Sequence, residues 1–178
     1  MRIAFLHYSE VIASTVSDHI SAFQKYSQNE INYFDVRTET ITYDMLKKFD
    51  AVIVHYTVAI FYDPRCPPWL RLILRRIPGK KIVFIQDEYR VVNDVIENLN
   101  FIKADLLFTC VPDHEIENVY ATSRLPRLMK VNNLTGYVPE DLLKLTPKTY
   151  EERELDVVYR ARRISMQYGS LGQEKWQI

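Results

Sequence analysis

Glycine and cysteine are both scarce in this chain of 178 residues, which contains 4 glycines and 2 cysteines. The glycine-rich loops that bind phosphate are missing: no GxGxxG follows the first strand-like segment, and no GxxxxGK[ST] occurs. The GxSxG motif that carries the nucleophile of α/β hydrolases is also missing. The sequence therefore argues against a dinucleotide-binding Rossmann domain, a P-loop enzyme and a serine hydrolase.

The two cysteines, Cys66 and Cys110, are far apart and form no CxxC pair. Nothing in this spacing suggests a metal finger or a disulfide framework, so a reducing, cytoplasmic location is expected. The histidines and acids show no short ligand spacing either, so no metal site is predicted. No long apolar segment follows the short run at residues 3–6, so we expect neither a signal peptide nor a membrane span.

Charge of one sign does not dominate, because 23 Lys and Arg residues balance 23 Asp and Glu residues. A balanced chain gives no support for a nucleic-acid partner. The run WLRLILRR at 69–76, followed by Lys80 and Lys81, is basic on one side. Such a side is usually a solvated helix face, and peripheral contact with an anionic membrane surface is the alternative.

Strand-like and helix-like segments alternate along most of the chain, which predicts an α/β fold with a doubly wound, mostly parallel sheet between helices. This is a Rossmann-like, three-layer architecture. The strand-like segments are 2–8, 31–36, 51–55, 82–85, 104–111 and 127–131. We expect the first and fourth strands to lie side by side at the centre, with the switch point of the sheet between them. Thr42, and Ser14 or Ser17, are predicted helix caps, and the prolines at 67–68 are predicted to begin a helix.

The pattern changes after residue 138. Segment 139–154 is polar and charged, and it is predicted to be a connector. Segment 155–160 is strand-like, and a turn with Gly169 and Gly172 then leads into a helix-like start. We predict a Rossmann-like N-terminal domain at 1–138, the connector at 139–154, and the truncated start of a second Rossmann-like domain at 155–178. A C-terminal tail that docks on the first domain is the alternative.

The segment KKIVFIQDEYR at 80–90 is the one around which the chain is organised. Its apolar half is typical of a buried parallel strand, and its polar half follows where that strand ends. The other strands also end in polar residues, and ligands bind at the carboxyl ends of strands in open parallel sheets. We therefore expect His7, Ser9, Gln86 and Asp87 to share one cleft. The alternative is that Asp87 caps the next helix and Glu88 is solvated.

Two runs near the end of the chain, DVVYRAR at 156–162 and YGSLGQEK at 168–175, point to a family. They resemble the opening of the second domain of GT-B glycosyltransferases, especially retaining-type bacterial ones. The layout of residues 1–138 is similar to the acceptor-side domain of that fold, and FIQDEYR at 84–90 adds to the resemblance. The resemblance implies transfer of a sugar from a nucleotide-sugar co-substrate to a small-molecule or glycan acceptor, without a tightly bound cofactor.

Carried over by this resemblance, Arg162 and Lys175 match positions that often pair with the donor diphosphate. Ala161 stands where the family commonly has glycine, and the acidic donor-binding motif late in the second domain is not in this chain. A polypeptide of these 178 residues should therefore lack a complete donor site.

An acceptor hydroxyl needs a partner to take its proton, so Asp87 or Glu88 is the predicted catalytic base, with His7 as the competing candidate. The predicted acceptor-binding residues lie at the same strand ends, and they are Tyr8, Ser9, His55, Gln86, Tyr89 and Asn132. A stand-alone α/β ligand-binding or regulatory module that uses this rim without catalysis is the alternative function.

Overall fold

The computed structural model describes residues 1–10, 13–88, 91–134, 138–159, 166, 169–170 and 173–174. The chain divides into two compact units, Met1–Pro139 and Glu140–Ile178. The first unit contains a six-stranded sheet with the order β2-β1-β3-β4-β5-β6. Its strands are β1 (Arg2–His7), β2 (Glu30–Asp35), β3 (Ala51–Val54), β4 (Lys80–Phe84), β5 (Leu106–Thr109) and β6 (Met129–Asn132).

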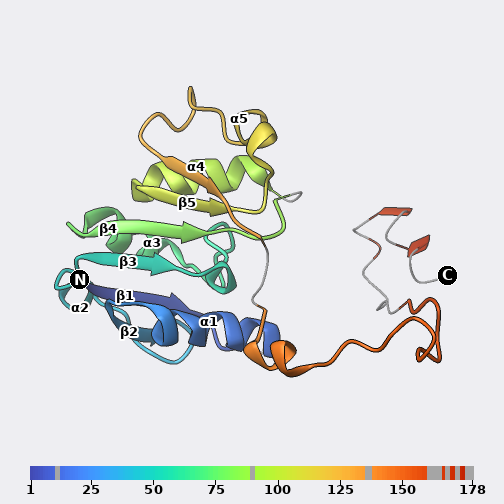
Figure 1. The fold of residues 1–178 in the computed structure, drawn as a ribbon. Helices are drawn as coiled ribbons and strands as arrows, with labels where there is room; N and C mark the ends of the chain where they lie inside the picture. Colours follow the sequence, from blue (N-terminus) through green and yellow to red (C-terminus); the bar gives the residue numbers. More distant parts are fainter. Residues whose placement is uncertain are drawn as a thin grey trace. The chain divides into compact units, whose positions relative to one another are not determined.

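Every neighbouring pair of strands in this sheet is parallel. Helical segments connect them: α1 (Ser14–Tyr26), α2 (Tyr43–Leu46), η1 (Tyr56–Val58), α3 (Pro68–Arg76), α4 (Val92–Ile102), η2 (Asp113–Glu115) and α5 (Ile116–Val119). The alternation of elements and the parallel pairing confirm the predicted Rossmann-like α/β fold. In Figure 1 the labelled strand arrows point in the same direction.

The expected neighbourhood of the first and fourth strands is wrong, because β3 lies between β1 and β4. The strand after β2 returns across β1 and pairs on its other side, and the remaining strands continue outward from there. The switch point therefore lies between β1 and β3, one strand away from the polar end of β4.

Local chemistry explains several helix boundaries. Thr42 caps α2 as predicted, because its hydroxyl accepts a hydrogen bond from the amide of Met45 at 3.3 Å. Proline opens α3 as predicted, at Pro68. The serine cap predicted for α1 is wrong, since the N-cap residue is Ala13 and no side chain caps the helix among the described residues.

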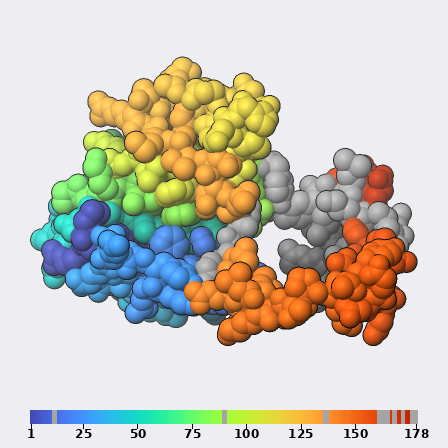
Figure 2. All heavy atoms as spheres, viewed as in Figure 1, coloured from blue at the N-terminus to red at the C-terminus, as the bar shows by residue number. Residues whose placement is uncertain are grey.

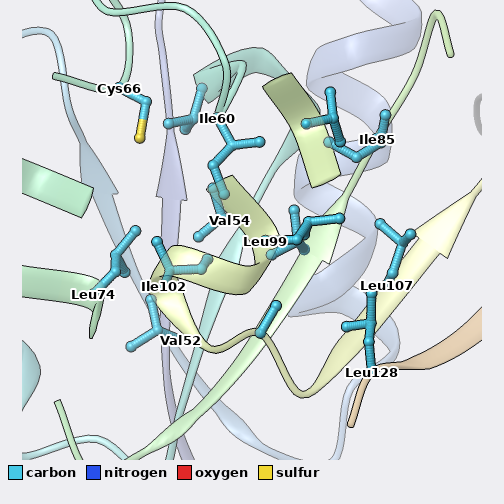
Figure 3. Close-up of a cluster of buried hydrophobic side chains, with 14 of the residues drawn as sticks. Val52, Val54, Ile60, Cys66, Leu74, Ile85, Leu99, Ile102, Leu107 and Leu128 are labelled. Carbon is cyan, nitrogen blue, oxygen red and sulfur yellow. The ribbon is translucent and has the colours of Figure 1, made fainter. Parts of the chain in front are cut away.

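The two faces of the sheet are covered differently. Side chains alternate along each strand, so β1 directs Phe5 to one face and Leu6 to the other. α1 covers the face of Phe5, where its own Ile20 and Phe23 pack. The opposite face carries a large aliphatic cluster shared with α2, α3, α4 and α5, shown in part in Figure 3. Figure 2 shows the heavy atoms of the first unit packed against one another on the face viewed.

The second unit has no comparable core among its described residues. Its one named element is η3 (Glu140–Lys144). The described part of the predicted strand, residues 155–159, forms no strand, and its Val157 side chain is 87% exposed. Without a neighbouring strand, the backbone N–H and C=O groups of residues 155–159 have no ladder partner, so these residues do not form a strand. None of the helices that the structure describes is long and apolar enough to span a bilayer.

Candidate functional site

The candidate site lies at the carboxyl edge of the sheet. Because all the strands are parallel, the residues that follow them meet along one edge, and the prediction of a shared polar rim is confirmed. Polar residues at the ends of β1, β3, β4, β5 and β6 stand along it, and they include His7, His55, Gln86, Thr109 and Asn132.

A partly open pocket lies at this edge. Its lining comes from α1, η1 and the segments at the ends of β4, β5 and β6, and consists of His19, Tyr56, Phe84, Ile85, Gln86, Phe108, Thr109, Cys110, Asn133 and Leu134. Aromatic faces and two side-chain amides dominate this lining, a mixture that suits a small ligand with both apolar and polar surfaces. Of the four residues expected in one cleft, Gln86 belongs to the pocket, whereas His7, Ser9 and Asp87 are not among its lining residues.

His55 is buried directly beside this pocket, with no exposed surface. Its Nδ1 accepts the amide hydrogen of Thr57 at 3.4 Å, which caps η1, and lies 2.9 Å from the Thr57 hydroxyl. Its Nε2 lies 3.1 Å from Nδ1 of His19. Burial, followed by the charges that His19 and His7 would carry, lowers the pKa of His55 to about 3. His55 is therefore neutral over the physiological pH range.

His19 links this buried histidine to the pocket. Its ring stacks on Tyr56 with centroids 5.7 Å apart and a 13° interplanar angle, and its edge contacts involve Phe23 and Phe84. Burial lowers the pKa of His19. The sequence-based prediction missed this residue, although its spacing from Val16 and Phe23 places it on the inward face of α1.

Glu88 has a defined structural task. Its Oε1 accepts hydrogen bonds from the Thr109 hydroxyl at 2.6 Å and from the Cys110 amide at 2.8 Å. These bonds tie the segment after β4 to the end of β5, which forms one wall of the pocket. Burial, and then the nearby charge of Glu88, raises the pKa of the Tyr120 phenol below this wall.

Asp87 is exposed and has a left-handed backbone conformation, with φ of 67°. It does not cap α4: that helix begins at Val92, its N-cap residue is Val91, and no side chain caps it among the described residues. Val91 is itself left-handed, with φ of 44°, which is strained for a β-branched residue. Backbone strain is thus present at Val91, the residue that precedes α4.

The segment that follows β1 is hydrogen-bonded to the end of β2. The amide of Ser9 donates to Asp35 at 3.1 Å, and its hydroxyl bonds to the same carboxylate. Although partial burial raises the pKa of Asp35, bonds from Ser9, Arg37 and Thr38 lower it overall. The amide and the hydroxyl of Ser9 are therefore both engaged by Asp35.

Two more predicted residues at this edge are also held by neighbours. The Tyr8 ring lies under the guanidinium of Arg65, 5.2 Å from its centroid, and the Tyr8 amide donates to Thr57 at 3.1 Å. His7 lies edge-on to Tyr33 at 6.3 Å, and its buried Nδ1 has no partner among the described residues.

Two neighbouring asparagines at the end of β6 have different surroundings. Asn132, the predicted acceptor-binding residue, donates its side-chain amide to the Val111 carbonyl at 2.8 Å. Asn133 lines the pocket instead. The predicted residues Tyr89, Arg162 and Lys175 lie outside the described part of the chain.

No cluster of three or more metal-ligating side chains occurs among the residues that the structure describes. Comparisons with protein-family models, with curated proteins and with solved structures found no match for this chain. The site is therefore interpreted from its own geometry.

Proposed function

We propose that this chain supplies the acceptor-side domain of a GT-B-type glycosyltransferase, which transfers a sugar from a nucleotide-sugar to a small-molecule or glycan acceptor. The observation that carries the proposal is the pocket at the carboxyl edge. Tyr56 and Phe108 offer aromatic surface to the apolar side of a sugar ring, and Gln86 and Asn133 offer amides to its hydroxyls.

The second unit supports the same proposal. Its described apolar residues are exposed, and they include Leu143 at 84% and Val157 at 87%. In this proposal the run 155–159 becomes the first strand of a second domain, whose remaining strands bury it. Arg162 and Lys175 would then bind the donor diphosphate, because two cations offset the charge that develops on the leaving group.

The two neighbouring carboxylates take different roles in this proposal. Glu88 already accepts two hydrogen bonds on Oε1, so it positions the loop. Asp87 is exposed at the same edge, so it is the residue to accept the proton of the acceptor hydroxyl. His7 remains the competing base, since a neutral imidazole has an unprotonated nitrogen that can accept a proton.

Turnover of a protein that joins this chain to a donor-binding second domain separates these roles. Asp87→Asn keeps the shape and loses the charge, and it should lower kcat about a hundredfold with folding intact. If Asp87→Asn and Glu88→Gln turn over like the wild type while His7→Ala is inactive, the base belongs to β1.

Donor binding provides a test with the 178-residue chain itself. Calorimetry against UDP- and GDP-sugars should detect weak binding or none, because the proposed donor site needs the second domain. Micromolar binding would show that a complete donor site is already present, and the assignment to an acceptor-side domain would fail.

A further inference from the structure

Resting on the proposed function, we infer that His19 determines acceptor specificity by donating a hydrogen bond from Nε2 to an oxygen of the sugar in the pocket. The inference follows from the hydrogen bonds that link Thr57, His55 and His19, in which each group donates to the next. It assigns a ligand contact to a helix that carries no predicted site residue.

The direction is set at Thr57. A backbone amide can only donate, so Nδ1 of His55 is an acceptor. The Thr57 hydroxyl accepts from the Tyr8 amide at 3.1 Å, and its own hydrogen is then available for the same Nδ1 at 2.9 Å. A neutral imidazole whose Nδ1 accepts carries its proton on Nε2.

The same reasoning passes from His55 to His19. Nε2–H of His55 donates across 3.1 Å to Nδ1 of His19, so that nitrogen is an acceptor. Because Nδ1 of His19 accepts, the ring proton of His19 is on Nε2, and burial, which lowers the pKa of His19, disfavours a second proton. His19 accordingly has one hydrogen to donate, and its other nitrogen is already engaged.

The packing of His19 keeps the ring in this orientation. Tyr56 stacks against one side, and Phe23 and Phe84 approach with interplanar angles of 68° and 73°. Rotation of the ring would separate Nδ1 from His55 and leave a buried N–H without its acceptor, which is costly. The ring of His19, which lines the pocket, is thus held in a fixed orientation.

This arrangement defines the chemistry of the ligand. The group facing His19 must present an acceptor oxygen, such as a sugar hydroxyl, ring or glycosidic oxygen. Since Nε2 already carries a proton, neutral His19 does not serve as the base that activates the acceptor hydroxyl. The proton of that hydroxyl must go to another group, which agrees with the role proposed for Asp87.

The first test is the protonation of the two rings in the wild-type chain. Long-range ¹H–¹⁵N correlation spectra of ¹⁵N-histidine-labelled protein at pH 7.5 distinguish the tautomers. We expect His19 and His55 both to be protonated on Nε2. A proton on Nδ1 of His19 would reverse the direction of these hydrogen bonds and overturn the inference, whatever the behaviour of any variant.

The second test compares binding of three probes, the methyl glycosides of β-D-glucose, β-D-galactose and α-D-mannose. His19→Phe keeps an aromatic ring next to Tyr56 and removes the donor, and His19→Gln keeps a donor. At least one glycoside should bind about tenfold more weakly to His19→Phe, with most of the affinity restored in His19→Gln.

The outcomes separate this inference from the proposed function. Equal affinity of the wild type and a folded His19→Phe would overturn the role of His19 and leave the acceptor site standing. No binding of any glycoside to the wild type would count against the acceptor site itself. Thermal unfolding confirms that each variant is folded before its affinity is compared.

Discussion

The two faces of the sheet differ in what they bury. One face carries aliphatic side chains such as Leu74 and Leu99, which need no hydrogen-bond partners. The α1 face carries a smaller cluster in which Phe5 packs against Phe23 and Tyr33, with ring centroids 4.9 and 5.2 Å apart. Histidines continue this second cluster toward the carboxyl edge.

The difference shows that one face of the sheet mainly contributes stability, whereas the other face also provides groups that can contact a ligand. Aliphatic packing gains free energy from burial alone and offers nothing polar to a ligand. Aromatic rings bury a similar area while leaving edges, faces and ring nitrogens for specific contacts. The pocket lies on the α1 face, where His19, Phe84 and Phe108 reach its wall.

The largest effect is expected on the aliphatic face. Leu74 is fully buried, so Leu74→Ala should lower the free energy of unfolding by about 3 kcal/mol, from lost burial and the cavity left behind. Leu72→Ala on the same helix, at a side chain 39% exposed, should cost below about 1 kcal/mol. Urea unfolding measures both, and equal losses would show that α3 does not pack as described.

Acid should destabilise the fold in part through the buried His55. The pKa of His55 is about 3 in the folded chain and about 6.5 when unfolded, so its stabilisation is complete above pH 6.5 and is lost as pH falls toward 3. The expected slope from His55 is about 1.4 kcal/mol per pH unit within that window.

His55→Asn supplies the matched control, because asparagine can also cap η1 and does not titrate. Its unfolding free energy, measured by urea titration at several pH values between 6.5 and 4.5, should fall less steeply than that of the wild type. Parallel curves for the two proteins would contradict the buried, neutral His55.

Substitutions of the two carboxylates after β4 should have different effects on stability. Glu88→Gln weakens two hydrogen bonds to Thr109 and Cys110, so we expect a loss of about 1.5 kcal/mol. Asp87→Asn is exposed and should change stability by less than about 0.5 kcal/mol. Chemical unfolding of the pair distinguishes them, and a costlier Asp87→Asn would reverse their roles.

The smallest effect should be a gain at the strained loop. Val91 has φ of 44°, so Val91→Gly should stabilise the chain by about 1 kcal/mol through relief of strain. Val92→Gly, one residue later and inside α4, should instead destabilise it. Melting temperatures that move the same way for both variants would argue against the left-handed turn.

Much of the fold was predictable because strand periodicity and capping are local signals. Thr42 and Pro68 mark helix starts in the sequence, and the parallel sheet follows from the alternation of elements. Strand order is not local, since it depends on which side of β1 each crossover packs. The expected pairing of the first and fourth strands was wrong for that reason.

Only the edge of the sheet at which the site lies was predictable from the sequence. The ends of the strands identify the rim, and Gln86 within it. They do not show which polar side chains at the rim are already hydrogen-bonded to neighbouring residues. Ser9 is bonded to Asp35, and Asn132 to Val111, through contacts that are distant in sequence. His19 lies on a helix, where no strand-end rule applies.

The most direct test of the central claim, that the pocket on the α1 face binds an acceptor sugar, is an NMR titration. Methyl β-D-glucopyranoside, methyl β-D-galactopyranoside and methyl α-D-mannopyranoside are each added to the ¹⁵N-labelled chain. The account predicts that at least one shifts the backbone amides of Gln86, Thr109 and Cys110 saturably, with residues around Leu74 unchanged. Shifts confined to other surfaces, or none with any of the three, would contradict it.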